Sequence, residues 1–219
     1  MSKSRRAEPP ALAAGSARPQ RENSREALLD ATSALMRELD TIEIGIVDIA
    51  QRAGVNHAMI RYFFGSKEGL LLALLDRDVY RRIRQLDRLF RMEVTPTERM
   101  RIHLRGILDT YYEIPYLNRL IQVMVREADP QRVQHIADEL LIPIASAQAR
   151  IIAEGIAAGE FRDVDPKLFY FNTIGSADGL YSNRFTLSAV FGGIPSADRA
   201  LHERYREHTV ETLMRGLLL

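Results

Sequence analysis

Apolar side chains recur three and four residues apart along most of this chain, which is the spacing of an α-helix that packs on one face. The sequence shows no convincing alternation of the kind typical of strands. Asn23, with Glu26 three positions later, resembles a capping box that starts the first helix. The apolar face of that helix is expected to contain Leu28, Ala31, Leu35 and Leu39. The pattern predicts an all-α protein.

Prolines and capping residues mark the later helices. Pro96, Pro130 and Pro166 each follow a residue that can cap a helix. Pro143 is expected to kink the helix that contains it, and Ser196 is expected to cap the last one. After the first helix, the expected helices span 46–53, 57–64, 66–91, 97–113, 116–127, 130–159, 166–190 and 196–217.

The N-terminal segment and the distribution of charge suggest how the chain is organised. Residues 1–21 are rich in Ala, Pro, Ser and Arg without periodicity, so we expect a disordered basic arm. The arm is either a solvated tail or a segment whose Arg18 and Arg21 reach the phosphates or minor groove of DNA. Residues 1–92 carry a net charge of +4 and residues 93–219 one of −3. That asymmetry suits a nucleic-acid-binding head, placed at 22–75, on a larger body at 76–219.

Several classes of protein are disfavoured by what the sequence lacks. Cysteine is absent, which excludes disulfides and thiolate metal sites and fits a reducing cytoplasm. The five histidines have no metal-ligand spacing, and no phosphate loop, dinucleotide fingerprint or nucleophile elbow occurs. We therefore expect no metal, no cofactor and no catalytic residues. No apolar run approaches the ~18 residues that span a bilayer, and the N-terminus is a poor signal peptide, so we expect no membrane partner.

Residues 46–70 carry the most informative motif, because two short helices are joined there by one tight turn. Ala50 is small enough for the two helices to cross closely, and Gly54 stands where the chain must leave the first of them. Asn56 is a good cap for the second helix. Ile49, Val55 and Ile60 are spaced to fill the gap between the helices, which leaves His57, Ala58 and Arg61 on the outer face. Such a pair of helices can place the second one in a DNA major groove.

With Phe63-Phe64, Ser66-Lys67-Glu68 and the leucine-rich run behind it, this segment resembles the Tet repressor family of bacterial transcription regulators. The resemblance covers about residues 22–80 and is strongest across DIAQRAGVNHAMIRYFFGSKEGLLLALL. It implies a helix-turn-helix head that contacts double-stranded DNA and a helical body that binds an effector and a second copy of the chain. The positions that correspond to the family's DNA contacts are Gly45, Asn56, His57, Ala58, Arg61, Tyr62 and Lys67.

The segment also departs from the family's usual pattern. Gly45 replaces a hydroxyl residue, which removes one phosphate contact, and Val47 and Asp48 give the first helix little positive charge. His57 stands where a lysine is frequent, so we hypothesise that the affinity for DNA rises as this side chain becomes protonated. Phe64 falls on the face of Ile60 and is expected to belong to the core.

The resemblance also assigns roles in the body. The last two expected helices correspond to the family's dimerisation pair, although an apolar stripe is more often internal core. The candidate dimer residues are Phe169, Ile174, Leu180, Leu187, Leu201, Tyr205, Thr209, Leu213 and Met214. The candidate effector residues are His103, Tyr111, Tyr112, Tyr116, Met124, Phe171, Asn172 and Tyr181, each of which can equally be ordinary core. Between head and body, arginines at 77, 81, 82, 84 and 88 either couple the two parts or form a solvated face.

Together these features predict a homodimeric, ligand-responsive transcription regulator, most simply a repressor on a palindromic operator. One rival is a DNA-bound structural protein of the same fold, such as a nucleoid or division factor. A second rival is an all-helical enzyme or carrier with a vestigial head. A single operator near a promoter would favour regulation over the structural role, and a salt-dependent binding slope would exclude the vestigial head.

Overall fold

The computed structural model describes residues 17–84, 86–127, 130–193 and 198–219, and helices dominate these residues as the apolar spacing predicts. Phe161 and Leu218 form an isolated antiparallel bridge. The α-helices are α1 Ala17–Leu39, α2 Ile46–Ala53, α3 Ala58–Phe64, α4 Lys67–Leu75, α5 Arg81–Ile83, α6 Leu86–Phe90, α7 Pro96–Glu113, α8 Leu117–Glu127, α9 Pro130–Ile136, α10 Ile142–Ala157, α11 Pro166–Tyr181, α12 Arg184–Val190 and α13 Arg199–Leu217, with π-helical turns η1 Asp76–Tyr80 and η2 Ala137–Leu141.

Side-chain caps start several of the helices where the sequence predicts. The Ser66 hydroxyl accepts a hydrogen bond from the N–H of Gly69 (3.1 Å), and the Thr95 hydroxyl accepts one from Glu98 (3.2 Å). Asp165 likewise caps α11. The last helix differs, because Asp198 accepts from the N–H of Leu201 (2.8 Å) and starts α13 after position 196. The predicted cap residue, Ser196, lies outside the described residues.

The first helix is longer than predicted and its apolar face is shorter. It begins at Ala17, so residues 17–21, which the composition predicts to be disordered, are helical, and the rest of the expected arm lies outside the described residues. Leu28 and Ala31 are buried, whereas Leu39 is 61% exposed. Leu39 fails to pack because the chain leaves the helix at Asp40, whose backbone is left-handed (φ 51°).

Three of the long predicted helices are interrupted. The helix predicted over 66–91 becomes α4, η1, α5 and α6. The one predicted over 130–159 contains the π-helical turn η2 just before Pro143, a residue that cannot donate a backbone hydrogen bond. The one predicted over 166–190 breaks at Ser182-Asn183, where Asn183 caps α12 by accepting from Thr186. Periodicity alone does not reveal these breaks, because the apolar spacing continues across each of them.

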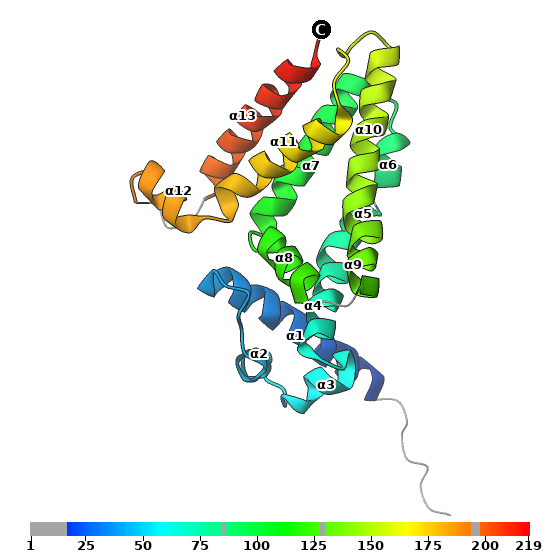
Figure 1. Ribbon diagram of the computed structural model, residues 1–219. Helices are drawn as coiled ribbons and strands as arrows, with labels where there is room; N and C mark the ends of the chain where they lie inside the picture. Colours follow the sequence, from blue (N-terminus) through cyan, green and yellow to red (C-terminus); the bar gives the residue numbers. More distant parts are fainter. Residues whose placement is uncertain (1–16, 85, 128–129, 194–197) are drawn as a thin grey trace, which may run out of the picture.

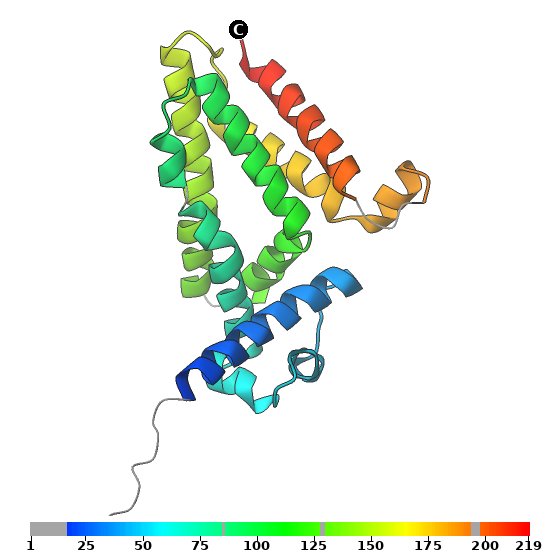
Figure 2. The same cartoon turned by 180° about the vertical axis from the view of Figure 1, so that it is seen from behind.

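Figure 1 shows a small head below a larger body. In the head, α1 packs against α2 and α4, and α3 packs against α4. In the body, α7 packs against α10, α11 and α13. The view from behind in Figure 2 places the C-terminus at the end of the body farthest from the head. Helix α4 leads from one part into the other, and one continuous cluster of buried side chains runs through both.

Two glycines permit close approaches that a larger residue would block. A Cβ at Gly69 would lie 2.0 Å from the carbonyl oxygen of Phe64, so the α3–α4 corner requires glycine there. A Cβ at Gly155 would lie 2.0 Å from the ring of Phe161, which packs across α10. Both glycines therefore set how neighbouring segments meet.

The segment Pro130–Ala157 is long and apolar enough to cross a membrane by length and composition, which corrects the expectation that no such run exists. In the structure it forms α9, η2 and α10, and α10 packs against α7 and α11. Ile151 and Ile152 of α10 are buried, whereas Arg150 and Glu154 are paired at its surface. This amphipathic packing is typical of a core helix.

Candidate nucleic-acid interface and internal cavity

The turn between α2 and α3 holds α3 at the surface of the head. Gly54 ends α2 with left-handed backbone (φ 68°), and its N–H donates to the carbonyl of Gln51 (3.1 Å). The amide oxygen of Asn56 accepts from the N–H of Ala58 (2.8 Å), which confirms Asn56 as the capping side chain. Ile49 on α2 and Ile60 on α3 are 0% and 2% exposed, so the side of each helix that carries its isoleucine faces the core.

Helix α3, which carries Ala58, Arg61 and Tyr62, lies on the side of the head that faces away from the body (Figure 1). Arg61 and Lys67 contribute positive charge there, and Lys67 is half-buried. Tyr62 is 61% exposed, with its ring edge-on to Phe63 at 5.0 Å between ring centroids. Phe64 is half-buried against the core rather than fully inside it. The exposed residues among those predicted to contact DNA are Gly45, Asn56, His57, Ala58, Arg61 and Tyr62.

Two acidic groups border this surface. A Cβ at Gly45 would lie 2.7 Å from Oδ2 of Asp48, so this carboxylate occupies the space that a hydroxyl side chain at 45 would need. A hydrogen bond with Ser66 holds the pKa of Glu68 below its usual value. The positive charge available for phosphate on this surface therefore rests mainly on Arg61 and Lys67.

Arg77, on the π-helical turn η1, ties the body to the head. Its guanidinium donates to Asp78 (2.6 Å), to Asp30 on α1 (2.7 Å) and to Glu26 on α1 (3.4 Å). Its side chain is only 15% exposed. Burial alone would lower the pKa of Arg77, but the hydrogen bonds and charges of Asp78 and Asp30 raise it overall. The predicted alternative of a solvated arginine face is therefore wrong for this residue.

A second connection joins the end of α1 to the body. Asp40 accepts from Arg119 on α8 (2.5 Å) and forms an ion pair with Arg184 on α12 (3.4 Å). Arg184 also donates to the carbonyl of Arg37, and Arg37 donates to the carbonyl of Glu113 at the end of α7 (2.8 Å). The head is thus held at the middle of α1 and at its C-terminal end.

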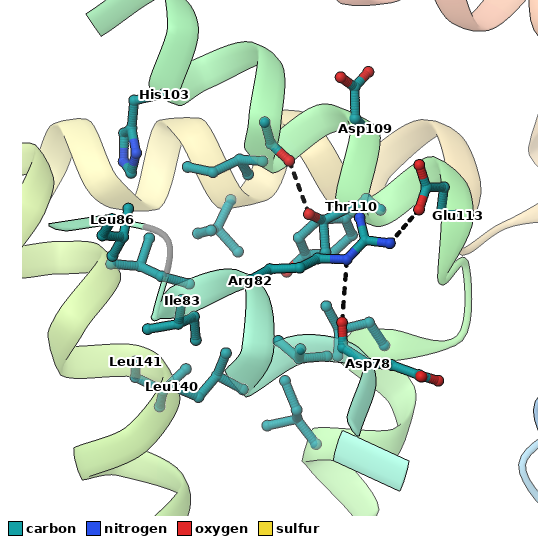
Figure 3. A pocket seen from close by; sticks show the side chains of 18 of the residues that line it. Asp78, Arg82, Ile83, Leu86, His103, Asp109, Thr110, Glu113, Leu140 and Leu141 are labelled. Atoms are coloured by element: carbon teal, nitrogen blue, oxygen red, sulfur yellow. Dashed lines mark hydrogen bonds and ion pairs between the residues drawn. The ribbon is translucent and has the colours of Figure 1, made fainter. Parts of the chain in front are cut away.

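A cavity of about 650 Å³, partly open to solvent, lies in the body between α7, α10, α11 and the segment from η1 to α6 and is called the internal cavity (Figure 3). Both π-helical turns contribute to its wall, and such turns often occur at functional sites. A smaller cavity of about 330 Å³ lies between α1 and the body and shares Arg77, Asp78, Arg82 and Glu113 with the larger one. The aliphatic lining of the larger cavity consists of Val79, Ile83, Leu86, Leu89, Ile102, Ile107, Leu117, Ile121, Leu140, Leu141, Ile144 and Ile174.

The charged groups of the larger cavity are paired with one another or with neighbouring residues. Arg82 reaches across the cavity, where it donates to the carbonyl of Asp78 (3.1 Å) and pairs with Glu113 (Figure 3). Asp109 accepts from Arg206 on α13 (3.0 Å). These arginines and carboxylates therefore neutralise each other at one side of the cavity.

His103 is the exception among the polar lining groups. It lies on α7 and is 5% exposed, and its Nε2 atom has no hydrogen-bond partner among the described residues. Burial lowers the pKa of His103 to about 4. The side chain is consequently a neutral imidazole at pH 7.

Behind Asp109, a second histidine connects the cavity wall to α13. His202 approaches Asp109 with Nε2 (2.9 Å) and the Tyr181 hydroxyl with Nδ1 (2.7 Å), and it stacks on Tyr112 (4.0 Å between ring centroids). A carboxylate can only accept, so Nε2 carries the proton and Nδ1 accepts from Tyr181. Sequence spacing does not reveal this cluster, because its members come from three helices.

The structure places only two of the eight predicted effector residues, His103 and Tyr111, in the wall of the larger cavity. Phe171 and Asn172 are exposed on the outer face of α11. The remaining four pack elsewhere because partners outside the cavity hold them: Tyr112 and Tyr181 join His202, Tyr116 donates to Ser33 (2.8 Å), and Met124 is buried on α8. Six of the predicted residues therefore lie outside the wall of this cavity, and the prediction did not include Arg82 or the aliphatic lining.

Most of the residues predicted to form a dimer interface are buried within one chain. Phe169, Leu180, Leu187, Leu201, Thr209 and Met214 are each at most 8% exposed, so they pack inside one chain. Tyr205 and Leu213 are half-buried, and Ile174 lines the larger cavity. The exposed apolar side chains of this region are instead Leu168 (64%), Phe171 (71%), Phe185 (83%) and Val190 (71%).

Across the described ranges of the chain, no group of three or more histidine, aspartate or glutamate side chains could hold a metal ion. The histidines that lie near carboxylates, such as His202 beside Asp109, are accounted for by hydrogen bonding within the fold.

Comparisons with known proteins match both parts of the chain to the same group. Residues 28–74 match the family described as bacterial regulatory proteins of the tetR family, and residues 93–219 match the tetracyclin repressor-like C-terminal domain. Over 126 residues the chain is 28% identical to the HTH-type transcriptional regulator BetI 1 of Chromohalobacter salexigens. The matched region covers 53% of this chain and 60% of that protein.

Solved structures with the same fold include two regulators. One is a TetR/AcrR family transcriptional regulator from Thermobifida fusca, with a TM-score of 0.65, 23% identity and coverage of 88% of this chain and 97% of the other. The second is FadR from Bacillus subtilis in complex with stearoyl-CoA, with a TM-score of 0.65, 19% identity and coverage of 87% and 98%. The all-helical architecture of a helix-turn-helix head on a larger helical body is thereby confirmed.

Proposed function

The chain belongs to the TetR family of transcription regulators and is not an enzyme, and from this we propose that it is a cytoplasmic, ligand-responsive repressor that binds a palindromic DNA operator as a homodimer. The observation that carries the proposal is a physical connection between two sites. Arg77 lines the internal cavity and also pairs with α1 of the head. A molecule in the cavity thus acts directly on a residue that positions the helix-turn-helix.

Contact with DNA is supported by the outward face of α3. His57, Ala58 and Arg61 are exposed whereas Ile60 is buried, and Lys67 follows at the start of α4. Arginine and lysine neutralise phosphate, and arginine can also bond the edge of guanine. No interaction within the head requires these side chains to be exposed together, whereas docking on a duplex does.

Selection of bound fragments from the source genome, followed by binding assays at several salt concentrations, tests the DNA contact. Arg61→Ala is expected to weaken binding by roughly tenfold or more, and Lys67→Ala is expected to reduce the salt slope by about one. Arg91→Ala, an exposed arginine between α6 and α7, is the matched control and should bind as the parent does. Unchanged affinity in Arg61→Ala and Lys67→Ala together would remove the proposed contact surface.

A dimer is supported by the outer face of α11. Leu168, Phe171, Gly175 and Gly179 are exposed at three- and four-residue spacing, and the two glycines face open space. The glycines, which have no side chain, let a second helix approach closely, and the large apolar residues beside them can pack against it. Exposed apolar patches of this kind mark association surfaces. One helix-turn-helix covers few base pairs, so two copies related by a two-fold axis are needed for a specific site.

Sedimentation or light scattering of the full chain tests the dimer. Phe171→Arg is expected to shift the protein towards the monomer, because two charges would meet near the two-fold axis. Val125→Arg, which changes an exposed apolar residue on α8, is the control. An unchanged mass for Phe171→Arg would show that α11 is not the interface.

The internal cavity separates regulation from the structural rival. Its volume lies within the ~300–1,000 Å³ typical of small-molecule sites, and a nucleoid or division factor has no need of such a site beside the head connection. The B. subtilis neighbour was solved with stearoyl-CoA bound, so this fold accommodates a ligand in at least one case. The expected genomic result is a small number of operators near promoters, and many scattered sites would favour the structural role.

A further inference from the structure

The internal cavity holds one polar atom that nothing in the described fold satisfies. Figure 3 shows His103 extending from α7 towards Leu86, away from the charged cluster around Arg82. Its Nε2 atom is buried without a hydrogen-bond partner among the described residues. Leaving such an atom unpaired costs free energy, so buried polar groups in native proteins almost always have a partner. A bound molecule that carries a hydrogen-bonding atom would supply it.

Each charged side chain that lines the cavity among the described residues has an ionic partner. Arg82 pairs with Glu113, Arg77 pairs with Asp78, and Asp109 pairs with Arg206. An ionised ligand would lose its hydration on entering and would find each of these groups already neutralised. Most of the remaining wall is aliphatic.

Resting on the proposed ligand-responsive function, we propose that the internal cavity binds an uncharged, mainly aliphatic molecule with one hydrogen-bonding oxygen, and that this oxygen meets Nε2 of His103. The aliphatic part lies against side chains such as Leu86, Leu140 and Ile144. Because His103 is neutral at pH 7, it supplies one directed hydrogen bond without adding a charge to the site.

Such a ligand would also reach the part of the wall that leads to the head. Val79 and Arg77 of η1 line the same cavity, and η1 packs against η2, which also lines it. A molecule that separates these two turns displaces Arg77 relative to Asp30 on α1. The residues that select the ligand and the residue that couples the cavity to the head therefore line the same cavity.

Displacement of Nile red, an uncharged dye that fluoresces in apolar surroundings, measures the preference on the full-length protein. The probes are 1-decanol, decanoate and decyltrimethylammonium, which share a chain and differ in the charge of the head group. The expected order is displacement by 1-decanol at a lower concentration than by either ion.

The variants His103→Leu and His103→Gln test the contact itself. Loss of one hydrogen bond should raise the half-displacing concentration of 1-decanol about three- to tenfold in His103→Leu. His103→Gln, which keeps a donor and an acceptor, should recover most of that loss, as a merely structural role would not. His208→Leu, an exposed histidine on α13, is the matched control and should match the parent.

The outcomes separate the inference from the function on which it rests. Tighter binding of decanoate or decyltrimethylammonium would refute the uncharged class while leaving a ligand-binding regulator. Equal displacement by 1-decanol in the parent and in His103→Leu would refute the role of His103. Failure of the dye and all three probes to bind would refute the internal cavity as a ligand site, and with it the proposed ligand response, whereas the DNA-binding assay would stand independently.

Discussion

Replacing Arg77 with methionine removes the charge that joins the body to α1 while keeping an apolar stem of similar length. In the parent, this guanidinium donates to Asp78, Asp30 and Glu26 at 2.6, 2.7 and 3.4 Å. The three acceptors differ in exposure: the side chain of Asp78 is 20% exposed, whereas those of Glu26 and Asp30 are 50% and 73% exposed. Their contributions to stability therefore differ as well.

The magnitude follows from those exposures. A charge-assisted hydrogen bond in a half-buried site, such as the one to Asp78, contributes about 1.5–3 kcal/mol. The exposed pairs with Asp30 and Glu26 contribute about 0.2–1 kcal/mol each because water screens them. Arg77→Met should therefore lower the free energy of unfolding by about 2–5 kcal/mol, and Asp30→Asn by less than about 1 kcal/mol.

Urea unfolding followed by circular dichroism at one protein concentration measures both changes. Arg91→Met, on an exposed arginine outside the head–body connection, should leave stability within about 0.5 kcal/mol of the parent. The same Arg77→Met protein should lose most of the effect of ligand on DNA affinity. A loss of stability no larger in Arg77→Met than in Asp30→Asn would refute the reasoning from burial, and an intact ligand effect would refute the coupling.

Three further predictions concern single residues. Burial depresses the pKa of His103 from its ordinary value of 6.5 to about 4. The neutral form therefore stabilises the fold above pH 6.5, and this contribution is lost as the pH falls towards 4. Thermal unfolding across this window should show the parent losing up to about 3 kcal/mol relative to His103→Gln. Gly69→Ala should destabilise the protein by about 2–4 kcal/mol, because the added methyl group would meet the backbone of Phe64. Gly106→Ala on α7, whose methyl group would meet no atom within 4 Å, should not destabilise it. Unfolding curves that rank the two variants the other way would contradict this prediction. Operator affinity should rise at acidic pH in the parent and depend less on pH in His57→Gln, as anisotropy titrations at pH 5.5 to 8 can show, and equal pH slopes in the two proteins would end that hypothesis.

Local chemistry made much of the head predictable. The cap at Asn56, the left-handed Gly54 and the small Ala50 act within a few residues of where they stand, so their roles follow from the sequence. The same holds for the start of α7 at Pro96 and of α11 at Pro166. The outward position of Ala58 and Arg61 also follows, because helical geometry turns the residues two before and one after the buried Ile60 away from its face, whereas His57 is exposed just before the first residue of α3.

Tertiary packing decided the rest, because those features depend on residues far apart in the chain. Periodicity cannot distinguish an apolar face that meets another helix of the same chain from one that meets solvent or a partner, so Leu180 and Leu201 proved to be internal and Phe171 exposed. The internal cavity is built from α7, α10, α11 and two π-helical turns, and its unpaired His103 and its link through Arg77 exist only where these segments meet. The sequence by itself determined the helical class, several of the caps and the family; the assembled fold determined where the long helices break, which side chains enclose a site and which ones connect it to the head.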